Sequence, residues 1–337
     1  MVTTFRCSGK STGSRLPCRA LALVLAGALV ASSQAFAQDY PSRAIRVVVA
    51  TGAGGGVDNT ARSLVKSLGD QSQISMFVDN RPGAGSTTGT DFVAKSAADG
   101  HTLLFSSGSS IVMNGFLYKN LPYDSLRDFV PVGFVAAYPF VLIARAELPA
   151  SSLAEFVRFA KERPGKLTFA SAGVGTLQHV WGTILFRSLG LDLLHVPYKA
   201  AAAAHVDLLG DRIDAMFDNM SGPIKHIQSG RLKALAVSPA SRAGQMPNVP
   251  TINESGLAKF DGESWMGMFA PAGTPAPIVD NLRAMVLKAA RDPEFSSRVE
   301  RDGGRVMLIA SPQQQQFLRL EIERWGGMIK QYAVTVD

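Results

Sequence analysis

The sequence predicts an α/β protein of two lobes, each built on a mainly parallel sheet with helices on both faces. Three observations carry this prediction. Two are patterns: short β-branched runs alternate with helical patterns in two successive series, and glycine-rich turns connect strand to helix in both. The third is length, because about 300 residues follow the N-terminal leader, and that length is enough for two cores.

The first 37 residues are typical of a secretory signal peptide. Residues 1–19 hold four basic residues and no acidic one, and an apolar run of 12 residues follows at 20–31. Ala35-Phe36-Ala37 fits the small-residue pattern of a cleavage site. A membrane-spanning helix needs about 20 residues. We therefore expect export and cleavage after about Ala37, with an uncleaved anchor as the alternative.

Composition excludes several classes of site. Both cysteines, Cys7 and Cys18, lie in the leader, so the exported chain has no disulfide, thiol nucleophile or cysteine-based metal site. Four of the 34 basic residues also lie there, which leaves 30 against 27 acidic residues, a net charge of +3. This balance, without a basic stripe, argues against nucleic-acid binding and allows a pocket for small acids.

The first series begins with a buried strand at 45–50. The helix after it places Val57, Ala61 and Leu64 on one stripe at helical spacing. The turn at 80–85 follows a second strand. The remaining elements expected in this series are strands at 75–80 and 101–107 and a helix at about 90–97.

The second series begins at Ser152, which with Glu155 forms a capping box for a helix that stops at Pro164. Strands are expected at about 167–171, 194–198, 213–219 and 232–238, and helices at 177–189 and 201–209. The tail is expected to contain helices at 276–291, after residue 293 and at 311–332, with a strand at 305–310.

The chain is expected to cross between the lobes near residues 138–143 and again near 264–269. A chain that leaves its first lobe and later returns makes a hinged pair of domains with a cleft between them. The predicted division is a signal peptide at 1–37, domain 1 at 38–140 and 266–337, and domain 2 at 141–265.

Three strand-to-helix turns, at 51–58, 106–110 and 171–179, are rich in Gly, Ser and Thr. Each follows a predicted parallel strand, and open α/β sheets bind ligands at the carboxyl ends of their strands. Helix N-termini offer free N–H groups and a partial positive charge. The three turns together favour a cradle for a carboxylate or another compact anion, although any one of them could be an ordinary connection.

Two enzymatic interpretations fit less well. The first turn supplies Gly52 and Gly54 of a dinucleotide fingerprint, and Asp79 could imitate its ribose-binding acid, but Val57 stands in the place of the last glycine. No P-loop lysine follows. A secreted hydrolase using Ser171 is the runner-up, although Phe169 occupies the place of the first glycine in a nucleophile elbow.

The five histidines show no metal-ligand spacing, so no metal site is expected. His101 and His195 begin strands and are interpreted as structural, whereas His179 could face the cleft. Trp181 and Trp265 could line a pocket wall or belong to the core.

Several stretches together resemble one family: "YPSRAIRVVVATGAGGGVDNTAR", "NRPGAGSTTGTDFVAKSAADGHTLL", "PGKLTFASAGVGTLQH", "VPYKAAAAAHVDLLGDRIDAMFDN" and "FAPAGTPAPIV". In this order they are similar to the Bug/TctC family, the periplasmic receptors of tripartite tricarboxylate transporters. The resemblance implies a two-lobed periplasmic binding protein of the Venus-flytrap type (type II), without catalysis or cofactor. Its implied partners are a small organic acid and the membrane subunits of a transporter, or a sensor kinase instead. A monomer is expected.

The resemblance also implies that main-chain N–H groups and waters hold the ligand in the cleft. Carried over motif by motif, the implied ligand-binding residues are Gly54, Gly55, Gly56, Asp58, Ser107, Gly108, Ser109, Ser171, Gly173, Gly175, Thr176, His179, Tyr198, Asp218 and Asn219.

Three departures from the family pattern concern the ligand more than the fold. The first loop has Ala50-Thr51-Gly52-Ala53 where an aromatic residue or proline is usual, which would enlarge the pocket. Ala200 replaces the usual glycine after "YK". Residues 180–183 replace the usual small-residue and glutamate pattern after the loop histidine.

Overall fold

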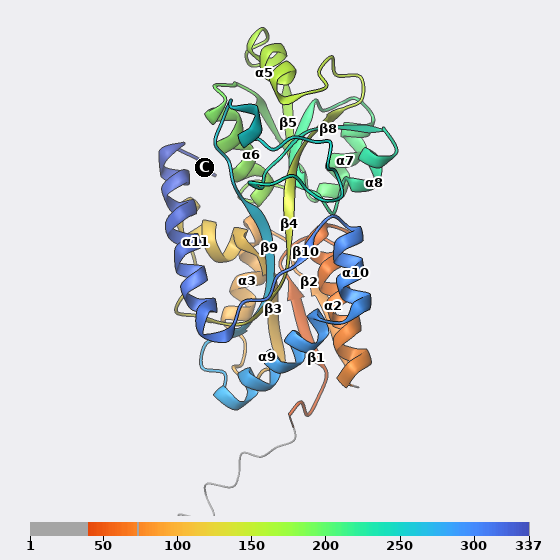
Figure 1. Cartoon of the computed structure of the whole chain (residues 1–337). Coiled ribbons are helices and arrows are strands. Elements are labelled where there is room, and N and C mark those ends of the chain that lie inside the picture. Colours follow the sequence, from red (N-terminus) through yellow and green to blue (C-terminus); the bar gives the residue numbers. More distant parts are fainter. Residues whose placement is uncertain (1–39, 73, 337) are drawn as a thin grey trace, which may run out of the picture. The chain divides into compact units, whose positions relative to one another are not determined.

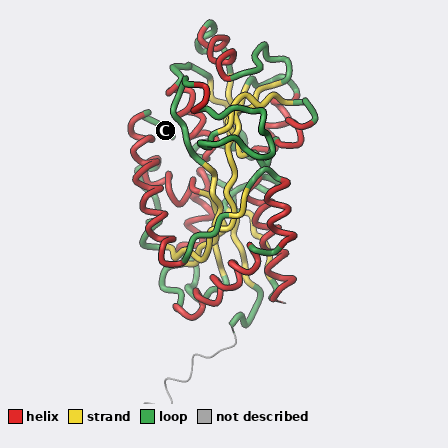
Figure 2. Tube along the Cα trace, viewed as in Figure 1, coloured by secondary structure: helices red, strands yellow, loops and turns green. Residues whose placement is uncertain are grey.

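The computed structural model describes residues 40–72 and 74–336. The predicted signal peptide lies outside these residues. The chain divides into a unit of residues 1–42 and a compact unit of residues 43–337, and the second unit contains both lobes. In this unit the predicted two-lobed α/β fold is confirmed (Figures 1 and 2).

Lobe 1 is built on three parallel strands in the order β2-β1-β3. They are β1 (Ile45–Val49), β2 (Met76–Asn80) and β3 (Thr102–Ser107). The crossover helices are α2 (Gly56–Ser72) and α3 (Thr87–Ala94). The β-branched residues of β1 are almost completely buried, as expected of a central parallel strand.

Lobe 2 repeats this arrangement with parallel strands in the order β7-β5-β6. The strands are β5 (Thr168–Ser171), β6 (Leu194–Pro197) and β7 (Ala215–Asn219). The helices are α5 (Leu153–Lys161), α6 (Leu177–Ser188), α7 (Ala201–Leu209) and α8 (Ile224–Gln228). The short helix η3 (Asn253–Ser255) comes after strand β8 (Leu232–Val237).

The long strand β4 (Phe129–Arg145) belongs to both lobes (Figure 1). It pairs with β9 (Glu263–Pro271) through residue 139 and with β7 and β8 from residue 140 onward, always antiparallel. Both expected crossings therefore fall on continuous strands. The exact domain boundaries at 140/141 and 265/266 stay a prediction.

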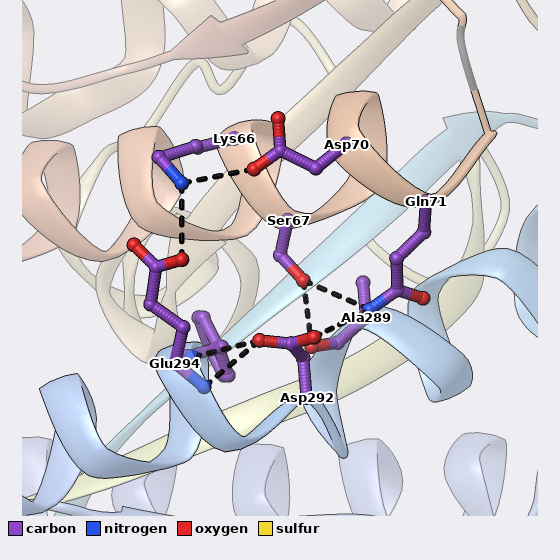
Figure 3. A network of polar contacts seen from close by, with 8 residues as sticks. Lys66, Ser67, Asp70, Gln71, Ala289, Asp292 and Glu294 are labelled. Atoms are coloured by element: carbon purple, nitrogen blue, oxygen red, sulfur yellow. Dashed lines mark hydrogen bonds and ion pairs between the residues drawn. The ribbon is translucent and has the colours of Figure 1, made fainter.

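The returning chain packs on lobe 1 through α9 (Ala276–Ala290) and α10 (Pro293–Arg301). Figure 3 shows the polar network that joins them to α2. Lys66 Nζ lies 3.0 Å from Glu294 Oε2, and Gln71 Nε2 donates to Asp292 Oδ2 at 3.0 Å. Ser67 Oγ donates to the carbonyl of Ala289. This network fastens the tail to the first crossover helix.

The last helix, α11 (Ser311–Gln331), contacts elements of both lobes, because it packs on β4 and on α6. Trp325 stacks on Trp181 of α6 at a centroid distance of 4.5 Å. Arg187 of α6 donates to the carbonyl oxygens of Tyr332 and Ala333. The core is correspondingly continuous: one cluster of buried apolar residues extends from Val48 in lobe 1 through these rings into lobe 2.

Some local expectations differ from the structure. The strand expected at 305–310 is only β10 (Arg305–Val306), and its pairing with β4 ends just after it, with a hydrogen bond from the N–H of Met307 to the carbonyl of Val135. After β3 the chain forms a π-helical turn, η2 (Ser109–Met113), and the short α4 (Asn114–Leu117). A single 3-10 turn, η1 (Ala84–Ser86), precedes α3. Within residues 40–72 and 74–336, no helix combines the length and the apolarity needed to cross a bilayer.

Candidate functional site

A cavity of about 900 Å³ lies where the carboxyl ends of the parallel strands of both lobes meet. Lobe 1 contributes the loop after β1, the loop at 82–86 and the end of β3. Lobe 2 contributes the loop after β5, the loop from β6 into α7, and the end of β7. The first turns of α2 and α6 are part of this wall, so two helix N-termini border the same space from opposite lobes.

The first loop is held in shape by Asp58, which is 1% exposed. Its carboxylate accepts hydrogen bonds from the N–H of Gly54, from Asn80 Nδ2 and from Arg62 Nε, each at 2.9 Å. Burial alone would raise the pKa of Asp58, but these hydrogen bonds outweigh it and lower the pKa. Asp58 is thus an ionised anchor of the glycine turn and does not line the cavity.

The second-lobe loop is held by two stacked histidines. His179 Nδ1 accepts from the N–H of Gly175 at 3.2 Å, and the His179 and His195 ring centroids lie 4.2 Å apart. His195 Nε2 lies 2.7 Å from Ser171 Oγ. Ser171 is fully buried, does not line the cavity, and no described carboxylate pairs with His195, so this pair lacks the access and the third member that a hydrolytic triad needs.

The histidine pair makes stability depend on pH. Burial lowers the pKa of His179 and of His195 from 6.5 to about 4. Between pH 6.5 and 4 the unfolded chain therefore binds more protons than the folded chain, and stability falls as pH falls. For His179 the slope is at most about 1.4 kcal/mol per pH unit. Urea unfolding of wild type and His179→Asn, whose amide oxygen can replace Nδ1 as acceptor, should show a flatter dependence in the variant. An equal slope in both proteins would contradict this assignment.

The two lobes touch through glycines at the rim of the cavity. A Cβ on Gly85 would lie 3.1 Å from the Cα of Gly175 and 3.1 Å from the carbonyl oxygen of Val174. A Cβ on Gly56 would lie 2.2 Å from Ser221 Oγ, and one on Gly52 would lie 3.3 Å from the Cβ of Ala200. Each pair joins a lobe-1 residue to a lobe-2 residue, so the lobes touch around the cavity, and at Gly85 the contact is with the main chain of lobe 2.

Most of the residues proposed from the sequence lie in the cavity wall. Those that line it are Gly54, Gly55, Gly56, Ser107, Ser109, Gly173, Thr176, Tyr198, Asp218 and Asn219. Those that do not are Asp58, Gly108, Ser171, Gly175 and His179. Three of these five support the loops from behind; Gly108 packs under Trp265, and Gly175 makes the contact with Gly85. Trp181 and Trp265 belong to the core.

Other wall residues were not singled out from the sequence. The sequence indicated only a turn at 80–85, from the motif "PGAG". In the structure residues 82–86 of this turn line the cavity, and residues 84–86 have positive φ angles. No sequence motif indicated that Gln178 and His205 line the cavity, because their positions depend on hydrogen bonds to the distant Asp218. Lys199 is the one lysine or arginine among the described lining residues, and no group of three potential metal ligands occurs in the described chain.

The family described as "TctC: Tripartite tricarboxylate transporter family receptor" matches residues 60–334. The chain belongs to this family. Among solved structures, the periplasmic binding protein BugD is 36% identical, with a TM-score of 0.84 over 88% of this chain and 99% of BugD. The chain is thus similar to a Bug protein as well, and the resemblance stated from the motifs is confirmed.

Two further solved structures are of related proteins with a small acid. MatC from Rhodopseudomonas palustris, solved with bound malate, is 31% identical, with a TM-score of 0.82 over 86% of this chain and 100% of MatC. R. palustris Rpa4515, solved with adipate, is 28% identical, with a TM-score of 0.84 over 88% of this chain and 99% of that protein.

Proposed function

We propose that this protein captures a small carboxylate in the cavity between its lobes and is a solute receptor without catalytic activity. The observation that carries the proposal is the shared cavity, bordered by helix N-termini from both lobes. The first turn of a helix leaves main-chain N–H groups without partners in the helix, and these groups bind anions. The malate and adipate bound by two relatives agree with this chemistry.

The polar wall supports the proposal further. Thr51 Oγ1 of lobe 1 and Asn219 Nδ2 of lobe 2 are buried and have no hydrogen-bond partner among the described residues. Both residues line the cavity. Unpaired buried donors are costly, about 1–3 kcal/mol each. A ligand or water bound between the lobes would pair them after a small rearrangement of the wall that exposes the two atoms to the cavity.

Capture would occur by closure. A ligand that contacts both lobes stabilises the arrangement in which the lobes touch. The stabilisation equals the difference between its binding free energy to both lobes and that to one lobe alone. The signal peptide would be removed after about Ala37, and the receptor would act as a monomer in the periplasm. It would deliver its ligand to the membrane subunits of a tripartite transporter, with a sensor kinase as the alternative partner.

A thermal-shift screen of the exported chain tests this function. Malate, adipate, citrate and benzoate, each at about 5 mM, are compared with succinamide, a neutral control. A ligand at about 100 times its Kd adds about 2.7 kcal/mol to stability, so at least one acid should raise the Tm while succinamide does not. Each mixture is then analysed by mass spectrometry. Turnover of an acid, or no Tm rise with any acid, would contradict the proposal.

A further inference from the structure

A buried carboxylate organises the lobe-2 side of the cavity. Asp218 is 1% exposed and accepts three hydrogen bonds. One comes from the N–H of Asn219 at 2.7 Å and one from Gln178 Nε2 at 2.9 Å. The third comes from His205 Nε2 at 2.7 Å. Asp218 also lines the cavity, and its role as a ligand contact stays a prediction.

These bonds fix how its two neighbours are oriented. An ionised carboxylate only accepts hydrogen bonds, so the amide nitrogen of Gln178 must face Asp218 and the amide oxygen must face away. By the same argument Nε2 of His205 carries a proton, and in the neutral ring Nδ1 is then an acceptor. Gln178 and His205 both line the cavity, and no described residue pairs with Gln178 Oε1 or His205 Nδ1.

The close packing of this group requires a small residue beside it. A Cβ on Gly222 would lie 2.8 Å from His205 Cε1 and 3.2 Å from Asp218 Oδ2. His226 is a further titratable side chain nearby; its ring lies 6.4 Å from that of His205, and it also lines the cavity. The ring of His205 is therefore confined between Gly222, which lies just before α8, and the carboxylate of Asp218.

We propose that Gln178 Oε1 and His205 Nδ1 recognise a hydrogen-bond-donating hydroxyl on the ligand, so that the receptor selects hydroxycarboxylates over the same acids without the hydroxyl. The inference rests on the proposed function. The helix N-termini would take the carboxylate, while the two acceptors in lobe 2 would take the hydroxyl. A second carboxylate at this position would face two acceptors and be repelled, whereas a hydroxyl donates to one of them.

Pairs of acids that differ by one hydroxyl test the inference by calorimetry on the exported chain. The pairs are malate and succinate, 3-hydroxybutyrate and butyrate, and 4-hydroxybenzoate and benzoate. In the pair that binds best, the hydroxylated acid should bind at least about tenfold more tightly to wild type. In Gln178→Met this ratio should fall to about threefold or less, mainly by loss of affinity for the hydroxylated acid.

Gln228→Met is the matched control, because Gln228 lies at the end of α8 and outside the cavity wall. It should keep the wild-type ratio. Equal affinities within every pair in wild type would overturn the inference while leaving the proposed function intact, and so would an unchanged ratio in a folded Gln178→Met. Binding of none of the six acids would overturn the inference, and it would contradict the proposed function as well only if no acid of the thermal-shift screen binds. The wild-type comparison needs no variant, so it decides even if Gln178→Met does not fold.

Discussion

Replacing Gly85 with alanine is expected to weaken ligand binding by about 5- to 150-fold, because a Cβ there would force the lobes apart. It would lie 3.1 Å from two main-chain atoms of lobe 2, the Cα of Gly175 and the carbonyl oxygen of Val174. Main chain cannot move aside as a flexible side chain can. The lobes would therefore separate, and the contacts that a ligand makes with both of them would be lost. Calorimetric titration with the best acid from the screen measures the effect.

Two other effects of this substitution need separate controls. Gly85 has a φ of +58°, where alanine is strained, and its Cβ would also meet the hydroxyl of Tyr118 at 2.5 Å. Gly256→Ala imposes similar strain at a φ of +68° with nothing within 4 Å, so it should leave affinity unchanged. Gly85→Ala combined with Tyr118→Phe removes the hydroxyl clash and should still bind weakly. Wild-type affinity in that double variant would show that the contact between lobes is unimportant.

The elements of both lobes could be predicted because their signals are local. The helix at 201–209 has the predicted bounds, since an alanine-rich run is flanked by Pro197 and Gly210. The Ser152 cap is confirmed: its Oγ accepts from the N–H of Glu155 at 3.2 Å. The reciprocal bond differs, because Glu155 Oε2 accepts from the N–H of Ser151 rather than from that of Ser152.

The continuity of β4 could not be predicted, because Pro139 lies in its middle and proline lacks a ladder N–H. In the structure, β4 changes partners just after this residue. The carbonyl of Pro139 still accepts a hydrogen bond, from the N–H of Met220 in lobe 2. The missing donor thus coincides with the change of lobe, which no local pattern signals.

The site was predictable in its loops but not in its pairings. Glycine-rich turns at strand ends correctly indicated which segments meet at the cavity. Which residue faces the ligand and which supports it depends on contacts between distant positions. Asp218 was proposed as a ligand contact and does line the cavity, but it also orients Gln178 and His205, which lie 40 and 13 residues away. Sequence spacing alone could not distinguish these two roles.

Replacing Trp325 with alanine is expected to lower the free energy of unfolding by about 3–5 kcal/mol, the usual cost of removing a large buried aromatic ring. Trp325 is 1% exposed and stacks on Trp181, whose ring in turn packs against Phe140 of β4 at 4.6 Å. The cavity left by the ring would lie between α11 and lobe 2. Because the C-terminal segment is also tied to α6 by Arg187, the loss should loosen α11 from the second lobe first.

Urea unfolding followed by near-UV circular dichroism measures this cost. Leu320→Ala, on the same helix but with the leucine 57% exposed, is the matched control and should change stability by no more than about 0.5 kcal/mol. Glu321 Oε2 accepts hydrogen bonds from the indole N–H groups of both Trp325 and Trp265, so Trp265 still pairs with this carboxylate in Trp325→Ala. The loss of stability in the variant therefore measures lost packing rather than an unpaired charge. If Trp325→Ala and Leu320→Ala were equally stable, α11 would not be a structural bridge between the lobes.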